Sequence, residues 1–325
     1  MTDNDRFIPP RYLRGSYTQT VLASARIRAM GRNPMRDASR EMIIDAGDGV
    51  RLQGFFSPRP GQRPAGLVIL LHGWEGSAES TYILHSGRFF FEQGFSVFRL
   101  NYRDHGNTHH LNEGIFRAIM LDEVFNAVAK AAGLEENVPC HLMGFSLGGN
   151  FALRIARRCS EKPIANVRHV ISVSPVIDPS RATDAIDHSP LLRYYFLKKW
   201  RRSLALKQER FPHLYDFRDI MRRDTIRSLT DALFERYNTG FDTESYFREY
   251  AIHRDALADV TTPTTIVTAR DDPAIPAEDF PGLLLSPSVR LIMHEYGGHN
   301  GFLEGVLAAT WYEKKALELF SAGSQ

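Results

Sequence analysis

Cysteine is nearly absent from this chain, since Cys140 and Cys159 are the only two among 325 residues. Two thiols cannot build the disulfide framework of a small secreted domain. A chain of this length also buries enough apolar surface to fold without disulfides or a structural metal. We therefore expect both thiols to be free, as in a reducing compartment.

Long apolar runs and a strong charge of one sign are missing as well. No stretch approaches the ~20 apolar residues that span a bilayer. The start, Met1 to Asp5, has neither the basic residues nor the apolar segment of a signal peptide. The net charge of +2 does not indicate a nucleic-acid partner. The sequence thus predicts a cytoplasmic protein without a transmembrane segment, and it leaves the oligomeric state open.

The chain does contain a regular alternation of short apolar runs and longer helical stretches, which predicts βαβ units. Residues 67–71 form an unbroken apolar run, typical of a strand that is buried on both faces. The turn at residues 47–49 (Gly-Asp-Gly) predicts an antiparallel hairpin. We expect an α/β fold with a mostly parallel eight-stranded sheet flanked by helices. The expected strands are 42–44, 52–56, 67–71, 95–100, 141–143, 170–173, 264–268 and 289–293, and the main expected helices are 82–93, 115–132, 149–158 and 303–320.

One segment, residues 178–259, interrupts this alternation because it contains no convincing strand. It is far longer than an ordinary connection. We interpret it as a helical lid (cap) inserted into a core domain formed by residues 1–177 and 260–325, the alternative being ordinary packing helices.

The stretch 191–200 within that segment is rich in aromatic and apolar residues. If it is helical, Phe196 and Tyr195 lie on a face that could cover an acyl pocket, and both are candidate substrate-binding residues. The neighbouring cations Lys198, Arg201 and Arg202 would then lie at the rim of the pocket. Between Arg181 and Arg227 twelve Lys or Arg stand against six Asp or Glu. This basic lid could contact an anionic head group or a membrane surface, although a solvated helix face is the simpler explanation.

The strongest local motif is residues 144–149 (Gly-Phe-Ser-Leu-Gly-Gly), which fits the G-x-S-x-G nucleophile elbow between an expected strand and an expected helix. The tight turn needs small neighbours and exposes the Ser146 hydroxyl at the carboxyl edge of the sheet. A serine hydroxyl is a weak nucleophile near neutral pH and requires a base. Ser146 is therefore the candidate nucleophile.

The candidate base is His299, in the glycine-rich loop after the last expected strand. In proteins with a nucleophile elbow of this kind, the three catalytic residues occur along the chain in the order Ser, then Asp or Glu, then His. Asp271 and Asp272 follow the preceding strand and are both candidates for the acid. His294 competes with His299, but it still belongs to the strand.

The loop at residues 72–76 (His-Gly-Trp-Glu-Gly) follows the strand at 67–71 and is the expected oxyanion loop. The backbone N–H groups of Trp74 and Leu147 are the expected donors. His72 is interpreted as a structural residue that holds the loop. The histidines at 105, 109 and 110 match no strong metal-ligand pattern, so we expect no metal there.

Together these motifs resemble the α/β-hydrolase superfamily and, within it, the YheT-like branch of esterases and lipases. The resemblance implies hydrolysis of carboxylic esters, lipid-like acyl esters among them, without a metal or another cofactor. It also favours Asp272 as the acid, because members of this fold often carry a proline four positions after it, here Pro276. Two parts depart from the branch: the lid lacks a clear acidic Phe-Asp pair, and the loop at 103–106 lacks an Arg-Gly-Cys start. The matching segments are residues 7–15 with 19–20, 72–77 with Ser80 and Tyr82, 144–150, 271–273 and 297–302.

Three functions are compatible with these residues. The first is a serine hydrolase that forms an acyl-enzyme on Ser146, with His299 as base and Asp272 orienting the imidazole. The second is an acyltransferase, in which an alcohol instead of water accepts the acyl group. The third is a catalytically silent binding protein, which usually lacks a triad residue, whereas this chain lacks none.

Overall fold

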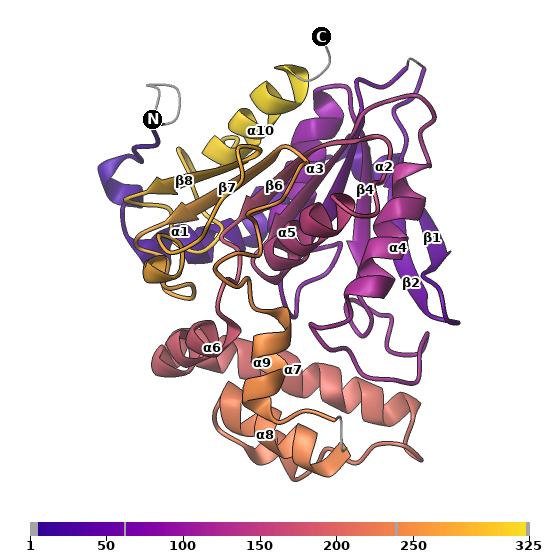
Figure 1. Cartoon of the computed structure of the whole chain (residues 1–325), viewed down its shortest axis with the longest axis vertical. Coiled ribbons are helices and arrows are strands. Elements are labelled where there is room, and N and C mark those ends of the chain that lie inside the picture. The colour runs from indigo at the N-terminus through magenta and orange to yellow at the C-terminus, as the bar shows by residue number, and fades with distance from the viewer. Residues whose placement is uncertain (1–5, 62, 238–239, 323–325) are drawn as a thin grey trace.

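The computed structural model describes residues 6–61, 63–237 and 240–322. It contains one eight-stranded sheet with the strand order β1-β2-β4-β3-β5-β6-β7-β8 (Figure 1). β1 pairs antiparallel with β2, as the hairpin prediction required, and β2 pairs antiparallel with β4, whereas the other neighbours are parallel. The predicted fold class is confirmed. The strands are β1 (Arg40–Asp45), β2 (Arg51–Ser57), β3 (Leu67–Leu71), β4 (Ser96–Asn101), β5 (Cys140–Phe145), β6 (Val167–Val173), β7 (Thr264–Ala269) and β8 (Val289–His294).

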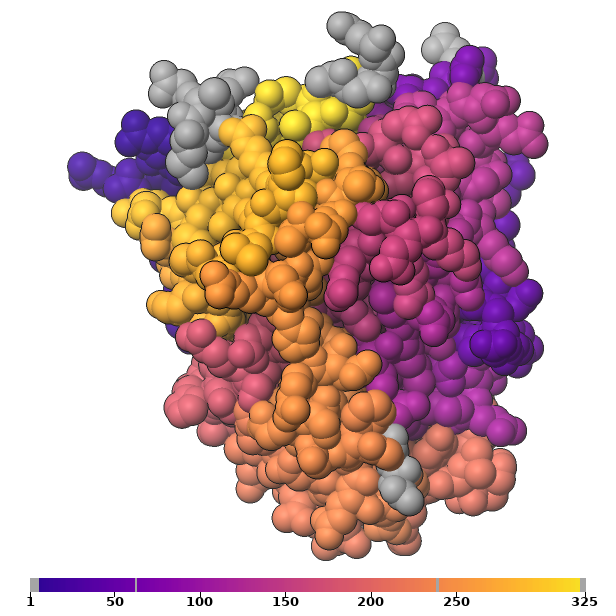
Figure 2. All heavy atoms as spheres, viewed as in Figure 1, coloured from indigo at the N-terminus to yellow at the C-terminus, as the bar shows by residue number. Residues whose placement is uncertain are grey.

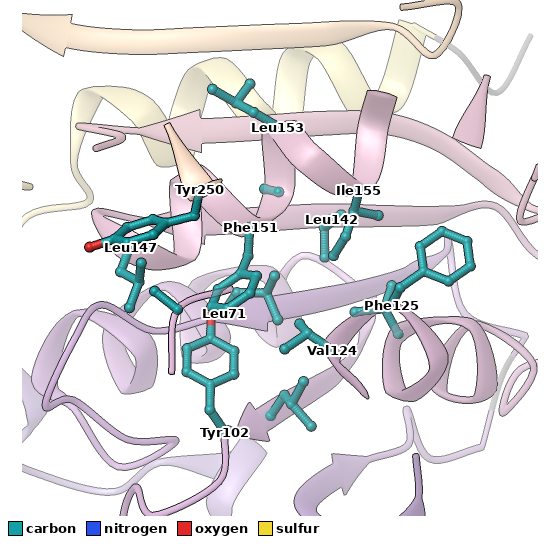
Figure 3. Close-up of a cluster of buried hydrophobic side chains, with 14 of the residues drawn as sticks. Leu71, Tyr102, Val124, Phe125, Leu142, Leu147, Phe151, Leu153, Ile155 and Tyr250 are labelled. Atoms are coloured by element: carbon teal, nitrogen blue, oxygen red, sulfur yellow. The ribbon is translucent and has the colours of Figure 1, made fainter. Parts of the chain in front are cut away.

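Helices cover both faces of the sheet because its central strands are apolar on both sides. Every residue of β3 is buried, and its side chains alternate between two separate cores. Figure 3 shows Leu71 and Leu142 of the sheet in the core that Val124 of α4 and Phe151 of α5 complete. The opposite face packs against α3 and α10. These helices are α3 (Thr81–Glu92), α4 (Leu121–Ala132), α5 (Leu147–Cys159) and α10 (Trp311–Ala322).

Two expected helices begin later than the sequence pattern indicated. The helix expected over 115–132 begins at Leu121, because tertiary partners hold the preceding backbone: the N–H of Phe116 donates to Asp104 and that of Ala118 donates to Tyr246. The helix expected over 303–320 begins at Trp311. The guanidinium of Arg28 donates to backbone carbonyls of the residues just before this helix, among them that of Val306 at 2.8 Å.

Helices also make up the segment between β6 and β7, and in the described part of residues 178–259 no β-strand occurs. Helix caps account for two of the helix starts: the Asp178 side chain accepts two backbone N–H groups and the Ser189 side chain accepts one, and each cap is followed by a proline at the first helical position. Figures 1 and 2 show this segment as a body below the sheet. It contains α6 (Pro179–His188), α7 (Pro190–Arg210), η4 (Ile220–Arg222), α8 (Ile226–Tyr237) and α9 (Thr243–Tyr250).

The N-terminal part of the chain crosses one end of the sheet before β1 (Figure 1). Residues 1–5, on which the expected lack of a signal peptide rests, lie outside the described residues. Cys140 and Cys159 are buried and free, as expected. Among the described helices, none combines the length and apolarity needed to cross a bilayer. The N-terminal elements are η2 (Arg11–Leu13), α1 (Ser16–Ala23), η3 (Arg26–Ala29) and α2 (Pro34–Asp37).

Candidate active site

Ser146 occupies the turn between β5 and α5 with φ 55° and ψ −117°, a conformation that is strained for a residue with a side chain. The turn depends on the two flanking glycines. A Cβ on Gly144 would lie 2.0 Å from the carbonyl oxygen of Gly148, and a Cβ on Gly148 would lie 2.3 Å from that of Leu71. The Ser146 N–H donates to the carbonyl of Val173 at 2.9 Å, which ties the turn to the neighbouring strand. The local backbone is therefore the elbow that the motif predicted.

His299 lies in the loop after β8, where its imidazole meets the carboxylate of Asp272. Nδ1 of His299 is 2.9 Å from Oδ2 and 3.1 Å from Oδ1 of Asp272. The Asp272 side chain is fully buried, and its Oδ1 also accepts the N–H groups of Ala274 at 2.8 Å and Ile275 at 3.0 Å. This carboxylate is thus fixed in a position from which it can hold one tautomer of the ring, with the proton on Nδ1.

Asp271 accepts a hydrogen bond from the backbone of the histidine loop instead of from the His299 ring. Its Oδ1 accepts the N–H of Gly298 at 2.9 Å, so it holds the backbone of the histidine loop and does not contact the ring. Burial, the largest cause, raises the pKa of Asp271. The same loop is held from the other side by Thr20 of α1, whose hydroxyl accepts the N–H of His299 at 2.9 Å. Of the two adjacent acids, only Asp272 contacts the imidazole.

The loop after β3 lies against the elbow. A Cβ on Gly73 would lie 3.1 Å from Cβ of Ser146, and the Gly73 N–H donates to the Tyr82 hydroxyl at 2.9 Å. Within the described residues, no acceptor contacts the N–H of Trp74 or that of Leu147. Both N–H groups therefore remain available to a ligand beside Ser146.

His72 begins this loop and is completely buried. Its Nδ1 lies 2.8 Å from the carbonyl oxygen of Gly73, and its ring packs against Tyr102 at 4.3 Å and His105 at 5.0 Å between ring centroids. Burial holds the pKa of His72 well below its ordinary value, so the ring is neutral. These contacts fit the structural role that the sequence indicated.

Ser146, Leu147, Trp74 and His299 all line one cavity, with an empty volume of about 1120 Å³ including its open mouth. Loop residues next to the sheet and residues of all four α-helices described within residues 178–259 line this cavity. Apolar lining residues from these helices are Ala182 and Ile186 of α6, Phe196, Trp200 and Leu204 of α7, Ile226, Leu233 and Phe234 of α8, and Tyr246, Phe247 and Tyr250 of α9.

The two tentative substrate-binding residues on α7 differ in position. Phe196 lines the cavity and stacks on Trp74, with ring centroids 5.4 Å apart. Tyr195 is 42% exposed and is not among the lining residues. Its ring instead packs edge-on against Phe196 and lies 4.8 Å below Nζ of Lys199. The structure thus brings Phe196, but not Tyr195, to the cavity.

Several lining residues were not identified from the sequence. Residues 115–118 border the cavity outside any helix or strand, and hydrogen bonds to Asp104 and to Tyr246 of α9 hold their backbone. The apolar pattern of this stretch indicated a helix, so the sequence did not identify it as part of the cavity lining. The α8 lining residues carried no motif of their own, and Thr20, which does not line the cavity, belonged to a matching N-terminal segment without a role being assigned to it. A buried pair between Lys207 of α7 and Asp104, 2.9 Å apart, fastens the segment to the sheet domain.

Polar groups gather at one side of the otherwise apolar cavity. Burial raises the pKa of Glu75 to about 8, although Lys199 opposes the shift. Burial also lowers the pKa of His105 to about 4, so this ring is neutral at neutral pH. Its Nε2 accepts the N–H of Glu75 at 3.1 Å, while Nδ1 donates to the carbonyl of Arg103 at 2.8 Å. The loop that carries Trp74 is therefore held by a neutral histidine.

The three histidines near residue 105 do not form a metal site. Nε2 of His105 is occupied by the Glu75 N–H, and Nε2 of His109 lies 2.8 Å from the Ser203 hydroxyl. Across the described parts of the chain, no group of three His, Cys, Asp or Glu side chains is arranged to hold a metal ion.

Relatives with curated names are similar over most of the chain. Putative esterase YheT of Escherichia coli (strain K12) is 24% identical over 318 residues, which cover 95% of this chain and 91% of that protein. Phospholipase ABHD3 of Mus musculus is 25% identical over 243 residues, covering 74% of this chain and 59% of the phospholipase. Among solved structures, the Pyrococcus furiosus esterase Pf2001 superposes with a TM-score of 0.59 at 15% identity over 98% of both chains, which shows the shared fold.

The family model described as serine aminopeptidase, S33 (Hydrolase_4), matches residues 62–304, that is 243 of the 325 residues. This match includes the elbow, both candidate acids and the histidine loop. The chain therefore belongs to this S33 family of α/β-hydrolases.

Proposed function

We propose that this hydrolase cleaves carboxylic esters through a covalent acyl-enzyme formed on Ser146. One observation carries the proposal: Ser146 and His299 line the same cavity, and the His299 ring is hydrogen-bonded to the buried Asp272. This combination supplies a nucleophile, a base and an orienting carboxylate.

In the proposed mechanism, Ser146 Oγ attacks the ester carbonyl while Nε2 of His299 takes its proton. Asp272 keeps the other proton on Nδ1 and stabilises the imidazolium that forms. The N–H groups of Trp74 and Leu147 donate to the oxyanion, each being worth roughly 2.7–4 kcal/mol of the barrier. His299 then protonates the leaving alcohol, and a water molecule deprotonated by the same ring releases the acid.

The apolar lining of the cavity supports lipid-like acyl esters as substrates. Its walls are mostly apolar, and each buried CH₂ contributes about 0.8 kcal/mol to binding. The names of the relatives, an esterase and a phospholipase, agree with ester substrates. We propose that residues 178–259 act as a lid over this acyl site, since all four α-helices described in the segment line the cavity.

The test is a panel of p-nitrophenyl acetate, butyrate and octanoate together with an amino-acid p-nitroanilide, because the family name refers to peptidases. We expect ester turnover that exceeds anilide turnover. Ser146→Ala and His299→Ala should each lower kcat by about 10⁴-fold or more, and the double variant should be little worse than either. A tenth of the activity remaining in Ser146→Ala, or a preference for the anilide, would contradict the proposal.

A further inference from the structure

A second, polar cavity adjoins the acyl cavity. The two share four lining residues, namely Glu75, Asp104, His105 and Ser203. The second cavity is also lined by Lys199 and Arg202 of α7 and by hydroxyl groups of the loop after Trp74. A molecule bound at Ser146 could therefore extend from an apolar cavity into a polar one.

The charges that line the second cavity are not balanced. Oδ1 of Asp104 is paired with Lys207 at 2.9 Å, and Oδ2 accepts the N–H of Phe116 at 2.8 Å, so this carboxylate is already satisfied. Lys199 donates to the backbone carbonyl of Glu75 at 2.9 Å and lies 4.8 Å from the centroid of the Tyr195 ring, and among the described residues no carboxylate is paired with it. Arg202 is solvent-exposed at the edge of this cavity, and its side chain makes no hydrogen bond or ion pair among the described residues.

The other acid in this cavity, Glu75, does not cancel these cations at neutral pH. Because burial raises its pKa to about 8, the carboxyl group is mostly protonated and can donate a hydrogen bond. The neighbouring basic residues Lys198 and Arg201 do not line this cavity: Arg201 binds the backbone carbonyl of Arg223, and Lys198 lies over the ring of Tyr194. Only Lys199 and Arg202 among these cations face the cavity.

We propose that the second cavity binds an anionic oxygen group, such as a phosphate, that the ester substrate carries. The inference rests on the proposed function and narrows its substrate class to esters with an acyl chain and an anionic group. Arg202 is the anchoring cation, since a guanidinium can bind such a group with two parallel hydrogen bonds.

The test compares the octanoyl esters of glycerol and of glycerol 3-phosphate, with released octanoate as the readout. We expect the wild type to favour the phosphorylated ester, and Arg202→Gln to lower the ratio of the two kcat/KM values by about tenfold. Arg201→Gln, on the same helix but outside the cavity, is the matched control and should keep the ratio. An Arg202→Gln ratio equal to that of the wild type would overturn the inference.

Two further measurements separate the possible outcomes. Inorganic phosphate should inhibit hydrolysis of the phosphorylated ester far less than free glycerol 3-phosphate does. Equal inhibition by the two compounds would mean that the cavity binds any free phosphate and does not select a substrate. Calorimetry with glycerol 3-phosphate and the Ser146→Ala variant, with and without Arg202→Gln, tests the site without turnover. If neither ester is hydrolysed, the proposed function fails, whereas Arg202-dependent binding would still support the anion site.

A different observation carries a second inference, which concerns α1, outside the residues matched by the family model. The Thr20 hydroxyl accepts the His299 N–H at 2.9 Å and donates to the Ser16 carbonyl at 2.8 Å. The fully buried Gln19 accepts the N–H of Leu303 at 2.8 Å. A Cβ on Gly298 would lie 2.3 Å from the Ser16 carbonyl oxygen, so helix and loop are in direct contact.

We infer that Thr20 is a positioning residue for the proposed base, acting through the backbone of His299. Thr20→Val keeps the side-chain shape but leaves the His299 N–H without its acceptor. Because a small displacement of the ring weakens proton transfer more than substrate binding, kcat should fall about tenfold while KM stays unchanged.

Thr20→Ser retains the hydroxyl and should restore kcat, which a purely structural role of the methyl group would not explain. Thr18→Val, at an exposed position of the same helix, is the control and should behave as the wild type. If Thr20→Val keeps wild-type kcat while Ser146→Ala is inactive, the positioning role is wrong and the proposed mechanism stands. If Ser146→Ala is active, the mechanism itself fails.

Discussion

The adjacent acids offer a sharp test, because Asp272→Asn and Asp271→Asn make the same chemical change one residue apart. In Asp272→Asn, Oδ1 can still accept the N–H groups of Ala274 and Ile275, so the loop keeps its conformation. The new NH₂ group, however, faces Nδ1 of His299, where Oδ2 accepted at 2.9 Å. Two donors cannot pair, so the ring changes to the tautomer with the proton on Nε2 and cannot accept the proton of Ser146.

The loss of the correct tautomer and of the charge that stabilises the imidazolium lowers kcat by about 10⁴-fold, or about 5 kcal/mol, in a comparable triad. Asp271→Asn leaves an oxygen to accept the N–H of Gly298 and touches no ring atom. The other oxygen of Asp271, Oδ2, is buried without a partner among the described residues, so no second hydrogen bond is broken. We expect Asp271→Asn to stay within about tenfold of the wild type.

The assay is steady-state hydrolysis of p-nitrophenyl octanoate, with thermal unfolding of each variant to verify that it is folded. Equal losses in the two variants, or a larger loss in Asp271→Asn, would refute the assignment of Asp272 as the orienting acid. An unfolded Asp272→Asn protein would be replaced by Asp272→Glu, which keeps the charge but displaces it from Nδ1 and should still lower kcat more than Asp271→Asn.

Three other predictions concern the cavity and its supports. Octanoyl esters should exceed acetyl esters in kcat/KM by at least about tenfold. Phe196→Ala should reduce this ratio of kcat/KM values in the same ester panel, whereas Tyr194→Ala, at an exposed position, should leave it unchanged. Identical kcat/KM values for all chain lengths would contradict an acyl site. Burial raises the pKa of Glu75 from 4.5 to about 8, so its contribution to the free energy of unfolding falls as pH rises from 4.5 to about 8 and is constant above that. Glu75→Gln lacks this titration, so in chemical unfolding it should gain about 1.4 kcal/mol per pH unit over the wild type across this range. A stability difference between the two proteins that does not change with pH would refute the shift. Lys207→Met leaves the buried Asp104 unpaired and should lower the free energy of unfolding by about 3–5 kcal/mol, whereas a loss below about 1 kcal/mol would show that the pair is not an anchor.

The sheet could be predicted because each strand is a short apolar run bounded by turn residues. Leu67–Leu71 is buried at every position, and the expected bounds of this strand match the observed ones. Local patterns failed where tertiary partners decide the backbone. Residues 115–120 have an apolar helical pattern, but hydrogen bonds to Asp104 and Tyr246, far away in the sequence, hold part of this stretch outside the helix.

The candidate site divides in the same way. Ser146 and His299 could be identified because the glycines around them are a local requirement of their turns. Asp272 contacts the ring, as the proline spacing of the family suggested, although the residues alone did not separate it from Asp271. Thr20 could not be found as a partner of His299, since its role depends on a contact between residues 279 positions apart.

The most direct test of the central claim is the mass of the intact protein after reaction with a serine-directed fluorophosphonate, followed by peptide mapping. The account predicts a single adduct on Ser146, no adduct in Ser146→Ala, and much slower labelling in His299→Ala, because the hydroxyl then lacks its base. An unlabelled wild-type protein, or an adduct on another residue that persists in Ser146→Ala, would contradict the assignment of Ser146 as the nucleophile.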